Sequence, residues 1–292
     1  MKIYAPKYYN YFKCSAQDCK NSCCINWEID IDSNTLHKYE SLSHPYSETI
    51  SKSIDYSNSP HFVLTSNNRC PHLNSKGLCN IIINCGEEYI CDICREHPRF
   101  YNYTNRGKEI GLGMCCEEAC KLIINSDCFD QMIEIGSNNE PLTKSEFNAI
   151  DKRKTVFKML KDNTVQIDGK VEMMYDYFDV FLYRYNFAKI MPTLEYLVED
   201  HKELLLKAKR LVWNRSFSDE LSRILAYYVY RHCSEASDYD EFFVSLSFAI
   251  FCTGLISALS KEYDLYEIAR IVSEEIEYSQ ENTDKIKALF SK

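Results

Sequence analysis

The cysteines of this chain constrain its fold more than any other feature. Thirteen of the fifteen lie between Cys14 and Cys128, and the other two are Cys233 and Cys252. The first residues, MKIYAPKYYNYFK, show neither the apolar segment nor the cleavage site of a signal peptide, so we expect a cytoplasmic protein. Thiols stay reduced there, and crowded reduced thiols usually bind metal. The alternative is that they are ordinary small apolar side chains.

The spacing of the thiols narrows the choice of metal. They form a C-x4-C-x3-C-C group at Cys14, Cys19, Cys23 and Cys24, a C-x8-C group at Cys70 and Cys79, a C-x2-C group at Cys91 and Cys94, and a last group at Cys115, Cys116 and Cys120. A pair of C-x2-C groups, or a group with paired histidines, would indicate a zinc finger, and neither is present. Iron–sulfur clusters take thiolates from separate loops, which suits this pattern. The nearby histidines show no i,i+4 pair, so we interpret them as surface or packing residues: His37, His44, His61, His72 and His97.

Charge and hydropathy argue against two classes of partner. The net charge is -9 and Lys and Arg do not cluster, so we expect no nucleic-acid binding. Residues 242–259, FFVSLSFAIFCTGLISAL, reach the lower length limit of a membrane span but include three Ser, one Thr and one Gly. We therefore expect a buried core helix and no membrane span.

With eight Gly in the chain, a doubly wound sheet with a glycine-rich phosphate loop is disfavoured.

The periodicity predicts a mainly α protein in which a Cys-rich N-terminal region with short strands and loops packs on a C-terminal helical domain. NWEIDID at 26–32 alternates like a half-buried strand, and Asp32 or Ser33 is a suitable cap for a helix that follows. The segment GSNNEP at 136–141 separates a metal-binding domain at 1–135 from a helical domain at 142–292, with Thr143 and Glu146 as a capping box. Apolar residues three and four apart predict helices within 171–190, 193–213, 220–232, 242–259 and 266–278.

Four segments together resemble the flagellin lysine-N-methylase family: FKCSAQDCKNSCCINWEIDID, RCPHLNSKGLCNI, ICREHPRF and LGMCCEEACKLI. LSRILAYYVYRH, at 221–232, is similar to a helical signature of the same family, so the resemblance covers most of the chain. The cysteine pattern alone is shared with a wider group of small zinc- or iron-chelating proteins.

The resemblance implies transfer of a methyl group from S-adenosylmethionine to lysine side chains of flagellin, with an N-terminal [4Fe-4S] cluster. The cysteines that match the pattern, and that we expect to bind the metal, are Cys14, Cys19, Cys23, Cys24, Cys70, Cys79, Cys94 and Cys116. Those additional to the pattern are Cys85, Cys91, Cys115, Cys120 and Cys128. Glu117 stands where the family has Pro, and His97 replaces the usual Tyr before Pro-Arg, so Cys91 or Cys115 can substitute for a neighbouring ligand.

The reaction and the metal leave alternatives open. Eight matched thiols exceed the four that one [4Fe-4S] cluster needs, so either two centres exist or some thiols only support the site. The C-x3-C-x2-C motif of radical enzymes is absent, which favours direct displacement on a neutral lysine amine. Arg95 and Arg99 are candidates for pairing with the carboxylate of S-adenosylmethionine, with structural salt bridges as the alternative. The competing functions are a non-catalytic zinc-binding interaction module and an iron–sulfur electron-transfer protein.

Overall fold

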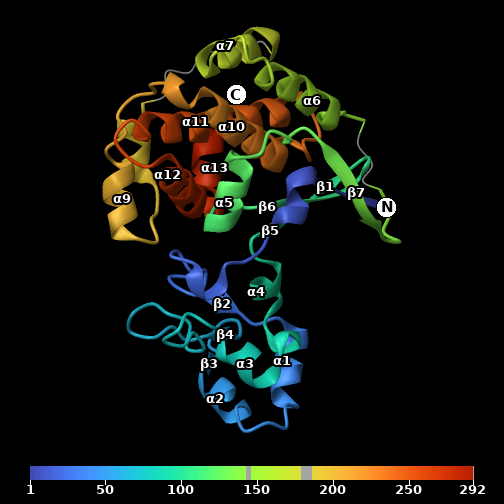
Figure 1. Cartoon of the computed structure of the whole chain (residues 1–292), viewed down its shortest axis with the longest axis vertical. Helices are drawn as coiled ribbons and strands as arrows, with labels where there is room; N and C mark the ends of the chain where they lie inside the picture. Colours follow the sequence, from blue (N-terminus) through green and yellow to red (C-terminus); the bar gives the residue numbers. More distant parts are fainter. Residues whose placement is uncertain (143–145, 179–185, 292) are drawn as a thin grey trace. The chain divides into compact units, whose positions relative to one another are not determined.

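The computed structural model describes residues 1–142, 146–178 and 186–291. The chain forms two compact units (Figure 1). The first, here called the helical unit, comprises Met1–Phe12 and Arg99–Lys292, and the second, here called the cysteine unit, is Lys13–Pro98. The predicted fold class is confirmed: the protein is mainly α, with a Cys-rich N-terminal region of short strands and a helical C-terminal part.

A four-stranded sheet lies at the edge of the helical unit, in the order β5-β6-β1-β7. Its strands are β1 (Lys2–Pro6), β5 (Arg99–Thr104), β6 (Gly107–Leu112) and β7 (Met132–Ser137). β5 and β6 form an antiparallel hairpin, while β1 runs parallel to β6 and antiparallel to β7. Gly107 begins β6 at φ +152°, and a Cβ there would lie 2.4 Å from the carbonyl oxygen of Lys2. Only glycine allows β1 to approach so closely.

The helices of this unit surround α10 and α11, which pack against each other and are buried along most of their length. The helices are α5 (Glu117–Ile124), α6 (Ala149–Leu160), α7 (Ile167–Phe178), α8 (Phe187–Ile190), α9 (Glu199–Leu205), α10 (Ser218–Cys233), α11 (Tyr239–Leu259), α12 (Leu265–Val272) and α13 (Gln280–Ala288). A π-helical turn, Ser273–Glu277, continues α12. By length and composition α11 passes the test for a membrane span, but 89% of its most apolar window is buried inside the protein, as expected of a core helix.

A buried ion pair connects the sheet to the helices. Arg153 on α6 donates to both carboxylate oxygens of Glu109 on β6, at 2.6 and 2.8 Å, and also donates to Ser234, which follows α10. The two charged side chains are 2% and 5% exposed. This bidentate geometry compensates the cost of burying both charges only while both partners are present.

The cysteine unit is built from short elements around a small core. A three-stranded sheet has the order β2-β4-β3, with β2 (Ile29–Asp30), β3 (Ile54–Asp55) and β4 (His61–Phe62). The helices are α1 (Ser33–Glu40), α2 (Ser47–Lys52), α3 (Asn80–Cys85) and α4 (Asp92–Glu96). The buried residues of this core are Ile29, Ile31, Tyr39, Ile50, Phe62, Ile81 and Cys91. The alternation predicted for 26–32 is confirmed at Ile29 and Ile31, and Asp32 caps α1 as expected.

The units do not follow the predicted boundary at 136–141. Residues 99–137 belong to the helical unit because β5, β6 and β7 form one sheet with β1, and because α5 packs against α12 and α10. The division into a metal-cluster domain at 1–135 and a helical domain at 142–292 stays a prediction.

The structure departs from the sequence prediction in two helices, within 193–213 and 266–278, and at the predicted capping box. Within 193–213 only α9 is a regular α-helix, and the N–H groups of Leu197 and Val198, just before it, donate to the carboxylate of Glu275. α6 begins at Ala149 with Asn148 as its cap, and Thr143 of the predicted capping box lies outside the described residues. α7 is described as far as Phe178, and residues 179–185 of the predicted helix 171–190 also lie outside the described residues. In 266–278 the helix continues as the π-helical turn.

Candidate metal centre

Asp32 joins the start of α1 to α4, the helix that carries Cys94. Its carboxylate accepts a hydrogen bond from Thr35 N at 2.9 Å at the start of α1, and another from Asp92 N at 2.9 Å at the start of α4. Burial opposes the charged form, but the backbone hydrogen bonds from Asp92 and Thr35 outweigh it and lower the pKa of Asp32. The turn that contains Cys91 is therefore fixed to the start of α1.

Backbone pairing brings cysteines together that are far apart in the sequence. Cys70 N donates to Cys24 O at 2.8 Å, and next to it Asn26 N donates to Asn68 O at 2.7 Å. An isolated bridge between Leu73 and Cys79 then closes the loop of the C-x8-C group. The vicinal pair and the C-x8-C pair are thus held side by side by main-chain hydrogen bonds.

Six thiols of the cysteine unit interact electrostatically with one another, and we call them the thiol cluster: Cys23, Cys24, Cys70, Cys79, Cys91 and Cys94. The hydrogen bond from Cys23 lowers the pKa of Cys24 to about 7, and the hydrogen bond from Cys94 lowers the pKa of Cys91. Burial raises the pKa of Cys70 to about 12. An array of adjacent thiols fits a metal that prefers thiolate ligands, because the metal replaces the shared protons.

Tyr39 adds a hydroxyl group to this cluster. The side chain is 4% exposed, its hydroxyl donates to the carbonyl oxygen of Tyr89 at 2.7 Å, and it lies 3.6 Å from Cys91 Sγ. Hydrogen bonds to a ligating sulfur tune a thiolate-bound metal, so Tyr39 is suited to that role.

Buried His72 and half-buried His97 are the histidines of the unit whose surroundings lower their pKa. Burial lowers the pKa of His72 to about 4, and its ring nitrogens lie 3.0 Å from the hydroxyl of Tyr46 and 2.9 Å from that of Ser53. Burial likewise lowers the pKa of His97 to about 4, and its ring packs edge-on against Trp27. These contacts are those of packing residues, and the absence of a ligand role for either histidine stays a prediction.

The expected metal ligands have different places in the structure. The thiol cluster contains five of them: Cys23, Cys24, Cys70, Cys79 and Cys94. Cys14 is exposed, with its Sγ accepting a hydrogen bond from Ala16 N at 3.4 Å, and Cys19 is half-buried. Cys116 belongs to the helical unit, where it precedes α5. The ligand roles of these residues remain predictions.

The structure adds Cys91 to the thiols that the resemblance selects. Cys91 is 1% exposed and bonds to Cys94 and Tyr39, although it is additional to the family pattern. The signal that identifies it was present in the sequence as the C-x2-C spacing of Cys91 and Cys94. Of the other additional cysteines, Cys85 Sγ lies 3.9 Å from His44 Nδ1.

Both arginines proposed to bind S-adenosylmethionine have protein partners. Arg95 pairs with Asp92 and donates to Ile90 O at 2.9 Å within the cysteine unit. Arg99, in the helical unit, donates to the Tyr9 hydroxyl at 2.8 Å and lies over the rings of Tyr9 and Phe12. These contacts fit the structural alternative, and pairing with a cofactor carboxylate stays a prediction.

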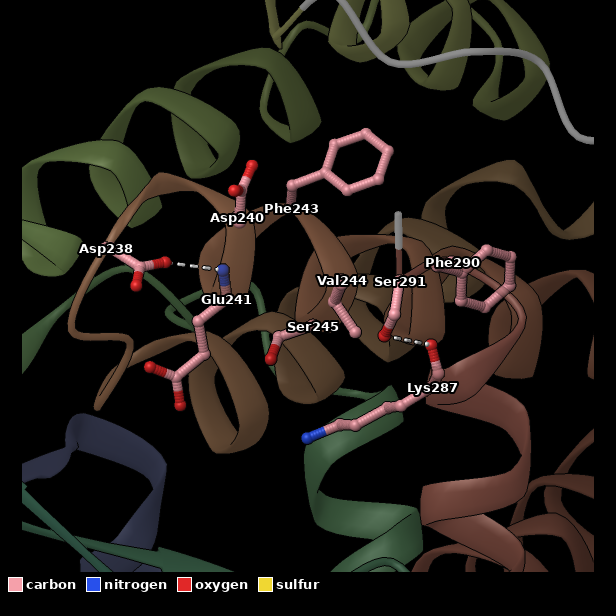
Figure 2. A pocket seen from close by; sticks show the side chains of 9 residues that line it. All are labelled: Asp238, Asp240, Glu241, Phe243, Val244, Ser245, Lys287, Phe290 and Ser291. Atoms are coloured by element: carbon pink, nitrogen blue, oxygen red, sulfur yellow. Dashed lines mark hydrogen bonds between the residues drawn. The ribbon is translucent and has the colours of Figure 1, made fainter.

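The helical unit contains a pocket of about 440 Å³ beside α11 and α13 (Figure 2). It is lined by Asp238, Asp240, Glu241, Phe243, Val244, Ser245, Lys287, Phe290 and Ser291. Two of the carboxylates already serve the start of α11: Asp238 accepts from Glu241 N at 2.8 Å, and Glu241 accepts from the backbone and hydroxyl of Ser237. Their charges are largely used in capping the helix.

Three curated proteins of Salmonella align with part of the chain. The lysine-N-methylase of Salmonella choleraesuis (strain SC-B67) is 24% identical over 134 residues, which cover 41% of this chain and 32% of the relative. The lysine-N-methylase of Salmonella typhimurium (strain LT2) aligns over the same shares at the same identity. The chain resembles the lysine-N-methylases. It spans about a third of their length.

The third relative is the flagellar biosynthetic protein FliU of Salmonella muenchen. It is 24% identical over 127 residues, which cover 41% of this chain and 75% of FliU. No family model matches the chain, and no solved structure matches it. The likeness to lysine-N-methylases therefore rests on these three proteins together with the four cysteine-containing segments of the sequence.

Proposed function

We propose that this chain is a protein-lysine N-methyltransferase that transfers the methyl group of S-adenosylmethionine to lysines of flagellin, with an iron–sulfur centre held by the thiol cluster. The observation that carries the proposal is the gathering of six thiols from four separate segments in the cysteine unit. The names of the relatives, lysine-N-methylase and flagellar biosynthetic protein, supply the reaction and its flagellar setting.

The donor chemistry supports an iron–sulfur centre over an oxygen-ligated metal. All six donors are sulfur, while buried His72 hydrogen-bonds to hydroxyl groups and half-buried His97 packs on an aromatic ring. Sulfur from separate loops is typical of iron–sulfur ligation, and zinc is the other metal that such a set accepts. When bound, an iron–sulfur centre supplies a redox-active or cofactor-positioning site. We propose that its ligands come from Cys23, Cys24, Cys70, Cys79, Cys91 and Cys94, and that the thiols beyond the four that one cluster needs support the site.

Methyl transfer by displacement requires the neutral form of the lysine amine. With an ordinary pKa of about 10.4, only about one lysine in 2,500 is neutral at pH 7. The protein must therefore remove water from the ammonium group or supply a base. Tyrosine and phenylalanine, 22 and 15 in number, are suited to exclude water and to face the sulfonium of S-adenosylmethionine with their rings.

The proposal is tested by incubating the anaerobically purified full chain with flagellin and S-adenosylmethionine carrying a labelled methyl group. We expect label in flagellin, located on lysine side chains by mass spectrometry of its peptides, and loss of the label when lysines are acetylated beforehand. Unmodified flagellin after incubation with metal-loaded protein would refute the methyltransferase.

The same preparation separates the two competing functions. A colourless protein with one tetrahedral zinc and no transfer would indicate the zinc-binding interaction module. A brown protein that cycles between redox states without consuming S-adenosylmethionine would indicate the electron-transfer protein.

A further inference from the structure

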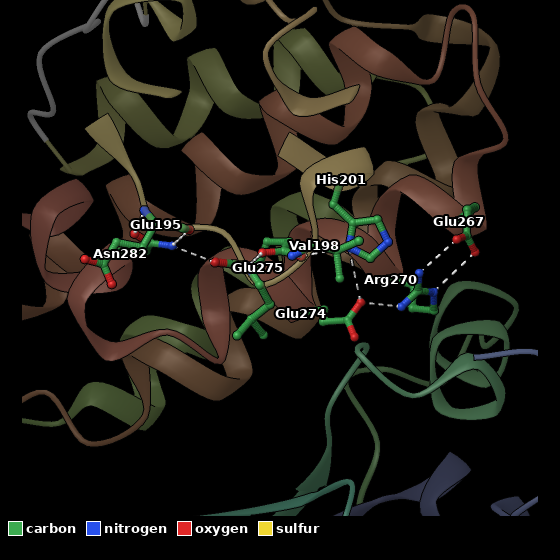
Figure 3. Close-up of polar contacts among 9 residues, drawn as sticks. Glu195, Val198, His201, Glu267, Arg270, Glu274, Glu275 and Asn282 are labelled. Carbon is green, nitrogen blue, oxygen red and sulfur yellow. Dashed lines mark hydrogen bonds and ion pairs between the residues drawn. The ribbon is translucent and has the colours of Figure 1, made fainter. Parts of the chain in front are cut away.

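A second group of side chains of the kinds that bind metals lies in the helical unit. His201 projects from α9 toward Glu274 and Glu275 on the π-helical turn (Figure 3). His201 Nδ1 lies 2.7 Å from Glu275 Oε1 and 3.7 Å from Glu274 Oε2, and the three ligand atoms all lie within 4.8 Å of one another. The side chains of His201, Glu274 and Glu275 are 17%, 11% and 0% exposed.

The charges of this group do not balance. In the described part of the chain, the cationic partners of the two carboxylates are Arg270 and, when protonated, His201. Arg270 also pairs with Glu267 at 2.8 Å, so its single charge is shared between Glu267 and Glu274. With neutral His201, the buried side chains of Glu274, Glu275 and Arg270 carry a net charge of minus one, and Glu267, which is 45% exposed, adds a negative charge next to solvent. A buried excess charge is costly, and either protonation of His201 or a divalent cation bound to neutral His201 would offset it.

The remaining contacts orient the carboxylates without using every lone pair. Glu275 Oε2 accepts Leu197 N at 2.7 Å, and Oε1 accepts Val198 N at 3.2 Å. Arg270 Nη1 donates to Glu274 Oε2 at 2.6 Å. A carboxylate oxygen has two acceptor positions, so each of the oxygens facing His201 can keep its donor and still bind a metal. Donors of this kind are the usual outer partners of metal-binding carboxylates.

The backbone explains why two consecutive glutamates serve one site. In an α-helix adjacent residues point about 100° apart. The wider π turn reduces that angle, and such turns occur frequently at functional sites. Asn282 fixes the turn by donating to the backbone oxygens of Glu275 and Glu195, both at 2.7 Å.

We propose that His201, Glu274 and Glu275 bind one divalent cation of the Mn²⁺ or Fe²⁺ class, and that this ion fastens α9 to the C-terminal helices. One imidazole and two carboxylates are nitrogen and oxygen donors, which suit these ions and differ from the all-sulfur cluster. The three protein ligands leave coordination positions for water on the partly exposed side of His201. The site is independent of the proposed methyl transfer.

The test uses Mn²⁺ as the probe, because thiolate sites prefer softer metals. The full chain is titrated with Mn²⁺, and binding is followed by the loss of the electron paramagnetic resonance signal of free Mn²⁺. We expect one Mn²⁺ per chain, and a nitrogen coupling in the pulsed spectrum of the bound ion. His201→Ala should remove the coupling, and both His201→Ala and Glu274→Gln should weaken binding at least about tenfold.

Glu199→Gln is the matched control, since Glu199 is a carboxylate of the same helix that pairs at the surface with Lys202. It should bind Mn²⁺ like the wild type. Glu274→Gln leaves the hydrogen bonds from Leu197 and Val198 to Glu275 intact, so circular dichroism should show a folded protein even if His201→Ala is unstable. Two results would overturn the site: wild-type protein that binds no Mn²⁺ at millimolar concentration, or binding that is unchanged in both variants. A protonated His201 would then be the counter-charge of the two glutamates.

Discussion

The buried pair of Arg153 and Glu109 gives the sharpest prediction for the stability of the helical unit. Replacing Arg153 by Met leaves the carboxylate of Glu109, 5% exposed, without its two hydrogen bonds of 2.6 and 2.8 Å. Removing one partner of a buried ion pair costs about 3–5 kcal/mol of unfolding free energy. For a unit of this size that corresponds to a fall in Tm of about 6–20 °C.

The assay is thermal and urea unfolding of the full chain, followed by circular dichroism at 222 nm, where the helical unit gives most of the signal. Arg106→Met is the matched control, because Arg106 pairs with Asp151 at 2.8 Å but both are about half exposed. We expect it to cost less than about 1 kcal/mol. The double variant Arg153→Met/Glu109→Leu should regain part of the loss, since it leaves no unpaired charge. A cost of Arg153→Met no larger than that of the control would refute the argument.

Three other changes test separate parts of the structure. Cys91→Ser should lower the metal content and alter the visible spectrum, while Cys85→Ser should change neither; equal spectra would remove Cys91 from the cluster. Burial lowers the pKa of His97 to about 4, below the ordinary value of about 6.5. Between these two pH values the unfolded form binds a proton that the folded form does not. The free energy of unfolding should therefore fall as the pH drops from about 6.5 to about 4. His97→Tyr should flatten this fall in urea midpoints measured by tryptophan fluorescence, and an unchanged slope would contradict it. Gly107→Ala should lower the free energy of unfolding by about 1–3 kcal/mol, because its Cβ would clash with the carbonyl oxygen of Lys2. Gly136→Ala should cost much less, because no atom lies within 4 Å of a Cβ at Gly136. Similar losses in the two variants would contradict the close approach of β1.

The sequence predicted those elements whose pattern is local. The alternation around Ile29 and Ile31, the cap at Asp32, and the long apolar run of α11 follow from side-chain periodicity, and the structure confirms them. The strand pairing of β1 with β6 and β7 joins residues more than 100 positions apart, and no local pattern encodes it. That pairing is why the unit boundary falls at Arg99 rather than near 136.

The candidate sites show the same difference. The thiols of the cluster were evident from their spacing, but the choice among them depended on family resemblance, which omitted Cys91. Its burial beside Tyr39 and Cys94 appears only when the chain is folded. Likewise, His201 is 73 positions from Glu274 in the sequence, so only packing of α9 against the π-helical turn reveals them as neighbours.

The central claim is that reduced thiols of the cysteine unit hold an inorganic iron–sulfur centre. The most direct measurement is quantification of iron, zinc and acid-labile sulfide per chain in anaerobically purified full-length protein, together with a count of free thiols after the metal is removed. The account predicts iron and sulfide in equal amounts, about four of each per cluster, and free thiols once the cluster is removed. Protein free of iron and sulfide, with its cysteines joined as disulfides, would contradict it.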